Sequence, residues 1–141
     1  MGKGHYDFLD HTADMAFRVE ADGFAALLAT ATRALGEVFL APGEGEILES
    51  RPVTVSGADP EDVVVAWLQE AVVLLEDEGW VVRDAEVRCA DAKGAEGVLH
   101  GRPLEPNERP DRVVKAVTYH DLRVERGTAS RPWRATIVLD L

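Results

Sequence analysis

Three acids, a histidine and a threonine lie close together near the start of the chain, where residues 6–14 read Tyr-Asp-Phe-Leu-Asp-His-Thr-Ala-Asp. Polar side chains crowded between two predicted strands cannot all be buried without partners, so they indicate a site at the surface. We expect Asp14 to be the anionic ligand of this site. His11 is a candidate for acid–base work, because imidazole titrates near neutral pH.

The other end of the chain also carries adjacent negative charges. The sequence finishes on Asp140-Leu141, so the terminal carboxylate lies one residue from the Asp140 side chain. Two carboxylates at a strand end repel each other unless a cation or a hydrogen-bond donor neutralises them. If this end lies beside the loop that follows the first strand, Asp14 supplies a third carboxylate, and three carboxylates suit a hard divalent ion. The alternative is that Asp14 caps a turn and Asp140 is solvated.

A second polar cluster, formed by Lys115, Thr118, Tyr119, His120 and Asp121, lies within one predicted strand. By alternation, Thr118 and His120 share one face of that strand, and Lys115 and Tyr119 share the other. His120 is the second candidate for acid–base work, although strand histidines are more often structural or exposed. The nucleophile elbow Gly-x-Ser-x-Gly, the phosphate loop Gly-x-x-x-x-Gly-Lys-Ser/Thr and the zinc motif His-Glu-x-x-His are all absent.

Two helices and seven strands are expected to position these residues. Alternating or apolar segments predict strands at 5–10, 15–21, within 47–56, and at 81–90, 97–104, 113–125 and 133–141, and helical spacing predicts helices at 24–40 and 60–78. Asp22 is expected to cap the first helix, and Asp59 with Pro60 to begin the second. The order predicts an α+β fold, with two helices packed on a mostly antiparallel sheet, in a single domain covering residues 1–141.

The composition is that of a globular protein, with 46% hydrophobic and 29% charged residues. No apolar run is long enough to span a bilayer, and the first residues predict no secretory signal, so we expect a cytoplasmic protein. Cys89 is the only cysteine, which excludes an intrachain disulfide and a cysteine-rich zinc site. Its strand-like surroundings predict a packed, inert thiol.

The formal net charge is −11, and it is unevenly distributed. Between Gly43 and Gly79 there are ten acids and a single base, Arg51. This balance argues against broad nonspecific binding of nucleic acid, which needs a basic face. An acidic face could steer the protein toward a basic partner such as an RNA-binding enzyme, or simply keep it in solution.

The His-Thr-Ala-Asp motif ending at Asp14, the later stretch Lys-Ala-Val-Thr-Tyr-His at 115–120 and the C-terminal Asp140-Leu141 closely resemble the archease family. The resemblance covers essentially the whole chain and implies an α+β fold. It also implies a protein cofactor of the RtcB-type tRNA-splicing RNA ligase, which promotes guanylylation of the ligase and lets it turn over repeatedly. By the same resemblance the protein is not an enzyme. From its charge and hydropathy we expect neither stable binding of nucleic acid nor contact with a membrane, and the sequence leaves the oligomeric state open.

Carried over residue by residue, the family's metal site falls on Asp14, Asp140 and the terminal carboxylate of Leu141. We expect a divalent ion there, Ca²⁺ foremost, with Mg²⁺ or Mn²⁺ as alternatives. The family's matching lysine and histidine fall on Lys115 and His120. The family usually has Ile or Val after His-Thr-Ala-Asp, where this chain has Met, a conservative difference that does not touch the expected ligands.

Two other functions remain open on the sequence alone. A small metal-dependent enzyme using His11 or His120 as its base predicts activity without a partner. A general binding module that uses its acidic face on basic proteins predicts binding that weakens steeply with salt and survives loss of Asp14.

Overall fold

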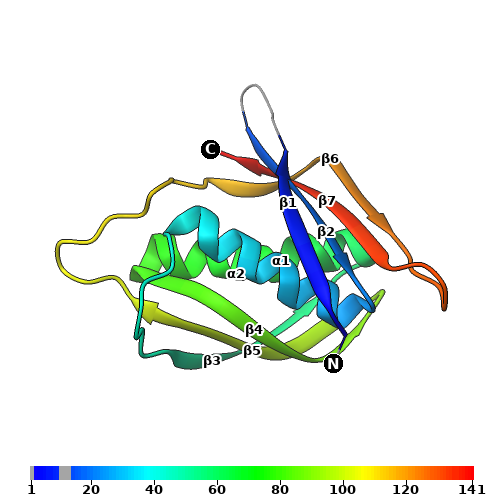
Figure 1. Cartoon of the computed structure of the whole chain (residues 1–141), viewed down its shortest axis with the longest axis horizontal. Helices are drawn as coiled ribbons and strands as arrows, with labels where there is room; N and C mark the ends of the chain where they lie inside the picture. The colour runs from blue at the N-terminus through cyan, green and yellow to red at the C-terminus, as the bar shows by residue number, and fades with distance from the viewer. Residues whose placement is uncertain (1, 10–13) are drawn as a thin grey trace.

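The computed structural model describes residues 2–9 and 14–141, and its elements follow the predicted order (Figure 1). The α+β class is confirmed. The elements are β1 (Gly4–Leu9), β2 (Met15–Ala21), α1 (Phe24–Phe39), β3 (Glu49–Ser56), α2 (Pro60–Glu78), β4 (Trp80–Asp91), β5 (Gly94–Pro103), β6 (Ala116–Glu125) and β7 (Trp133–Asp140).

The strands form two sheets rather than one. The first has the order β1-β2-β7-β6 and the second the order β3-β5-β4, and the pairs described between neighbouring strands are antiparallel. Both helices lie between the two sheets (Figure 1). The burial of α1 agrees with this position, because 11 of its 16 residues are buried. A helix that is apolar nearly all round must be covered on more than one side.

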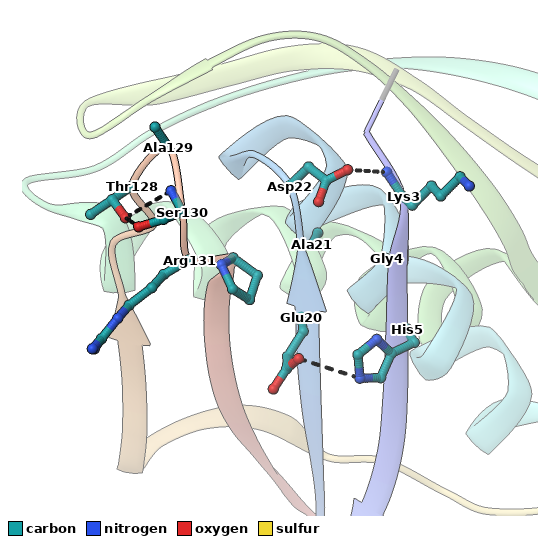
Figure 2. A pocket seen from close by; sticks show the side chains of 11 residues that line it. Lys3, Gly4, His5, Glu20, Ala21, Asp22, Thr128, Ala129, Ser130 and Arg131 are labelled. Atoms are coloured by element: carbon teal, nitrogen blue, oxygen red, sulfur yellow. Dashed lines mark hydrogen bonds and ion pairs between the residues drawn. The ribbon is translucent and has the colours of Figure 1, made fainter.

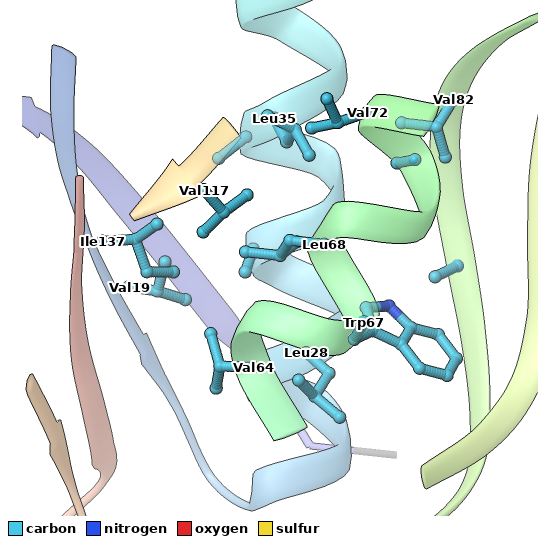
Figure 3. Close-up of a cluster of buried hydrophobic side chains, with 14 of the residues drawn as sticks. Val19, Leu28, Leu35, Val64, Trp67, Leu68, Val72, Val82, Val117 and Ile137 are labelled. Atoms are coloured by element: carbon cyan, nitrogen blue, oxygen red, sulfur yellow. The ribbon is translucent and has the colours of Figure 1, made fainter. Parts of the chain in front are cut away.

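The core lies where the two helices meet both sheets (Figure 3). Leu68 of α2 and Leu28 of α1 are fully buried there, between Ile137 of the first sheet and Val82 of the second. Trp67 is also fully buried, and its indole N–H donates to the Thr32 hydroxyl at 3.0 Å, which satisfies the polar end of the ring. Among the described residues, neither helix has both the length and the apolar character needed to cross a bilayer.

The two helices begin differently. α2 begins as predicted, because the Asp59 carboxylate accepts from the backbone N–H of Asp62 at 2.8 Å and Pro60 follows it. The expected cap of α1 is wrong: Gly23 is the N-cap, and no side chain caps it. Asp22 instead accepts from the backbone N–H of Lys3 at 3.0 Å, and thereby fastens the start of the chain to the end of β2.

Cys89 is exposed, so the prediction of a packed thiol is wrong. Val87 is buried, and strict alternation would turn Cys89 to the same side. The pairing of β4 with β5 shifts register between these two residues, however. The shift leaves both Arg88 and Cys89 in solvent, as expected when a bulge adds a residue to one strand.

Candidate functional site

The pairing of β2 with β7 brings Asp14 and Asp140 to the same end of the first sheet. The two strands are in register up to the pair Met15↔Leu139. Asp14 comes directly before β2 and Asp140 is the last residue of β7, so each is next to this pair, and adjacent antiparallel strands lie about 4.8 Å apart. Asp14 is half-buried and Asp140 is exposed. Two carboxylates that are 126 positions apart in the sequence are therefore neighbours in space.

The start of β6 lies on the other side of Asp140. The backbone N–H of Lys115 donates to the carbonyl oxygen of Asp140 at 2.8 Å, and Ala116 is paired with Asp140. The Lys115 side chain is exposed. Leu141 is half-buried and packs against the hydrophobic core, which holds the end of the chain beside these strands. The structure thus gathers Asp14, Lys115, Asp140 and Leu141, which we call the sheet-end cluster.

His120 lies in a wide bulge of β6. Thr118 is paired with Val138, but Arg123 is paired with Thr136, so five steps along β6 correspond to two along β7. Asp121 adopts a positive φ of 58° in this bulge. The regular alternation of side chains along β6 therefore ends at Thr118, and it does not extend to His120 as the sequence predicted. The His120 side chain is 72% exposed, and its Nε2 lies 3.2 Å from a carboxylate oxygen of Asp121.

Tyr119 fastens the bulge to the start of α2. Its hydroxyl donates to the Asp62 carboxylate, which also accepts from the backbone N–H of Ala58 at 3.0 Å. The hydrogen bond from Tyr119 is the main cause that lowers the pKa of Asp62, and the bond to Asp62 raises the pKa of Tyr119. Sequence reasoning missed this contact, because no local signal links residues 57 positions apart.

The loop that leads to Lys115 is held by a network of charged side chains. Arg102 Nε lies 2.6 Å from Glu46, and Arg102 Nη1 lies 2.7 Å from Glu108. The Arg83 side chain, only 8% exposed, contacts Glu46 at 3.2 Å and donates to the Leu40 carbonyl at the end of α1. The hydrogen bonds from Arg102 and from the backbone N–H of Glu105 lower the pKa of Glu108 to about 2.

In the same network, burial alone would raise the pKa of Glu46, but hydrogen bonds and charge from Arg102 and Arg83 outweigh it and lower that pKa. Later in the loop, the backbone N–H of Asp111 donates to the carbonyl oxygen of Phe39, the last residue of α1, at 2.7 Å. The chain therefore enters β6 from a fixed loop.

The sheet-end cluster contains oxygen ligands suited to a hard cation. Within residues 2–9 and 14–141, no three His, Cys, Asp or Glu side chains are grouped so as to hold a metal ion. Asp14 and Asp140 supply two side-chain carboxylates, and the terminal carboxylate of Leu141 is the third donor of the expected set. Such donors fit Ca²⁺ or Mg²⁺, whose remaining positions are filled by water. His11, the other candidate in the motif, lies outside the described residues.

A depression of about 560 Å³ lies at the opposite end of the same sheet (Figure 2). Its polar groups contact one another. His5 Nε2 lies 3.4 Å from Glu20, Lys3 donates its backbone N–H to Asp22, and the hydroxyls of Thr128 and Ser130 are 3.4 Å apart (Figure 2). Because these polar groups already have partners within the protein, they are less suited to bind a ligand than the carboxylates of the sheet-end cluster.

Known proteins resemble this chain along almost its whole length. The family model described as Archease protein family (MTH1598/TM1083) matches residues 6–141. The Protein archease of Methanopyrus kandleri is 35% identical over 96% of this chain and 99% of its own, and that of Pyrococcus abyssi is 31% identical over 96% and 98%. The solution structure of Methanobacterium thermoautotrophicum protein 1598 shares the fold, with a TM-score of 0.78 and 23% identity over 96% of this chain and 98% of that chain.

Proposed function

The chain belongs to the archease family, and we propose that it is the protein cofactor of an RtcB-type RNA ligase in the cytoplasm. In this role it promotes guanylylation of the ligase and lets the ligase turn over repeatedly during tRNA splicing or RNA repair. The supporting observation is the sheet-end cluster, because the motif acid Asp14 and the C-terminal Asp140 end adjacent strands. These are the residues that the family resemblance selects, and nothing local in the sequence brings them together.

We further propose that Asp14, Asp140 and the terminal carboxylate of Leu141 hold a divalent ion, Ca²⁺ foremost. When bound, the ion supplies positive charge that neutralises the three carboxylates and is open to an oxygen ligand of the partner. The chain's own part is to fix the carboxylates. The pairing of β2 with β7 holds Met15 beside Leu139, directly next to Asp14 and Asp140, and the packed Leu141 side chain holds the chain end.

The sheet-end cluster also suits docking at a basic active-site entrance. Its carboxylates lie at the end of a sheet whose strands are paired up to that point. An acidic projection meets a basic, nucleotide-binding entrance with complementary charge, which favours association and orientation of the two proteins. The exposed Lys115 side chain adds one positive group beside the acids, where it could pair with a phosphate oxygen of a nucleotide held by the partner.

The test is ligation by the cognate ligase, held below the substrate concentration, with and without this protein. We expect multiple turnover and rapid ligase guanylylation with the unmodified protein, and loss of both with Asp14→Asn or Asp140→Asn. Glu86→Gln is the matched control, since Glu86 is an exposed carboxylate on β4 of the other sheet. Full activation by both Asn variants, or ligation by this protein without the ligase, would contradict the proposal.

A further inference from the structure

Two arginines flank a threonine on the outer face of the first sheet. Thr136 of β7 is paired with Arg18 of β2 on one side and with Arg123 of β6 on the other. Both arginines are exposed, whereas Phe17 and Val19, on either side of Arg18, are buried toward the helices. Strands two places apart lie about 10 Å from each other. Two long arginine side chains at that separation can therefore converge over the threonine between them.

The next row of the sheet has a different charge pattern. There His5, Glu20, Arg134 and Glu125 follow one another across the four strands. Each contacts its neighbour, at 3.4 Å for His5 and Glu20, 2.8 Å for Glu20 and Arg134, and 3.8 Å for Arg134 and Glu125. Opposite charges that alternate in this way stabilise cross-strand pairing and leave little net charge.

The row that contains Arg18, Thr136 and Arg123 has two bases and one acid, Asp7, so it keeps an excess positive charge. Across residues 2–9 and 14–141, neither of the two guanidinium groups makes an ion pair or a side-chain hydrogen bond. Asp7 is opposite Arg18 in the register, on the side away from Thr136, but forms no ion pair with it in this part of the structure. The three residues line a depression of about 310 Å³ together with Arg134 and Glu125.

The bulge in β6 creates this arrangement. Without it, the pairing of Thr118 with Val138 would continue to His120 opposite Thr136. The three extra residues of the bulge instead place Arg123 there, and they reverse which residues of β6 face outward. The bulge is fastened to α2 through Tyr119 and Asp62, so the position of Arg123 is maintained by the fold.

We propose that Arg18, Arg123 and Thr136 form a binding site for a phosphate group carried by a nucleotide or an oligonucleotide. A phosphate presents several oxygens on different sides, which can accept from both guanidinium groups and from the hydroxyl at once. A carboxylate has two oxygens in one plane and is matched by a single arginine. The formal charge of −11 opposes binding of a long polyanion, so the site takes one phosphate rather than a length of nucleic acid.

Binding is measured on the isolated protein by amide NMR titration with inorganic phosphate, GMP and a 5′-phosphorylated trinucleotide, alongside the same trinucleotide with a 5′-hydroxyl. We expect saturable shifts at residues around 18, 123 and 136. The double variant Arg18→Gln/Arg123→Gln should weaken binding by about tenfold or more. The double variant Arg88→Gln/Arg112→Gln is the control, because it makes the same charge change at exposed arginines elsewhere and should stay within about twofold.

Thr136→Val keeps the branched shape, removes the hydroxyl, and should weaken binding by about threefold to tenfold. A preference for GMP or for the 5′-phosphorylated trinucleotide identifies the source of the phosphate, and either preference supports the site. Equal weakening by the two double variants, shifts at other residues, or equal competition by acetate would overturn it. No ligase is present in this experiment, so its failure would leave the proposed function untouched.

Discussion

The backbone N–H of Lys115 donates a 2.8 Å hydrogen bond to the carbonyl oxygen of Asp140. This bond joins the start of β6 to the end of β7 and holds the last residues of the chain against the sheet. The half-buried side chain of Leu141 provides a second anchor. The backbone around Asp140 is therefore held in place by two contacts. A change at the chain end should alter the charge of the sheet-end cluster more than the position of its residues.

The first prediction concerns that end. Extending the chain beyond Leu141 converts its terminal carboxylate into a neutral amide and removes one of the three proposed donors. We expect Ca²⁺ affinity, measured by calorimetric titration, to fall by about tenfold or more. The same extension added before Met1 should leave affinity unchanged. Equal affinity of the two extended proteins would remove Leu141 from the proposed ligand set.

The second prediction concerns acid stability. The pKa of Glu108 falls from 4.5 to about 2 in the folded protein, mainly through its hydrogen bonds from Arg102. A lowered folded-state pKa means that the contribution of this carboxylate is present above pH 4.5 and is lost as the pH falls from 4.5 toward 2. Glu108→Gln should therefore show a shallower loss of unfolding free energy over that interval than the unmodified protein.

Urea denaturation at half-unit pH steps measures this slope. Glu105→Gln is the control, because Glu105 is exposed in the same loop and its carboxylate contacts no side chain in the described part of the chain. It should reproduce the pH dependence of the unmodified protein. Parallel curves for the Glu108 variant and the unmodified protein would show that the contact with Arg102 does not contribute to acid stability.

The third prediction concerns the end of α2. Gly79 adopts a left-handed φ of 63°, and a Cβ atom there would meet nothing within 4 Å. Gly79→Ala should therefore cost about 1–2 kcal/mol from the backbone conformation alone. Gly43, exposed in the loop that follows α1, has only ordinary contact distance around an added methyl group, and its φ lies outside the left-handed region. Gly43→Ala should lose less than about 0.5 kcal/mol, as judged by thermal or urea unfolding of both variants.

The fourth prediction concerns the buried hydrogen bond between the two helices. Thr32→Val removes the acceptor of the Trp67 indole N–H, which is fully buried. An unsatisfied buried donor costs about 1–3 kcal/mol, so unfolding free energy should fall by that amount. Thr54→Val, at an exposed position of β3, should change it by less than about 0.5 kcal/mol. A change at Thr32 no larger than at Thr54 would mean that water or a shifted side chain replaces the lost acceptor.

Local patterns were sufficient to predict most of the elements. The acid and proline at 59–60 predicted where α2 begins, and the glycine after Glu78 predicted where it ends, because caps depend only on neighbouring residues. The cap at Asp22 was wrong because Lys3, far away in the sequence, supplies that carboxylate with a donor. Strand alternation was likewise reliable until a bulge intervened, as it does before Cys89 and after Thr118.

The candidate site was predictable only in part. We expected Asp14 to approach Asp140 only if the chain end lay beside the loop after the first strand. The register of β2 with β7 brings Asp14 and Asp140 to the same end of the sheet. The convergence of Arg18 and Arg123 over Thr136 was not predicted, because it depends on a bulge whose length no sequence periodicity records. The division of the strands into two sheets was also missed, since helical spacing reveals which face of a helix is apolar but not how many layers cover it.

The exposed position of Cys89 makes this chain convenient for spectroscopy. It is the only cysteine, it lies in β4 of the second sheet, and both helices separate that sheet from the sheet-end cluster (Figure 1). A maleimide-linked fluorophore or spin label attached there would modify one defined position on the far side of the fold. Association with a partner at the carboxylate end could then be followed without engineering any new attachment point and without placing the probe in the contact.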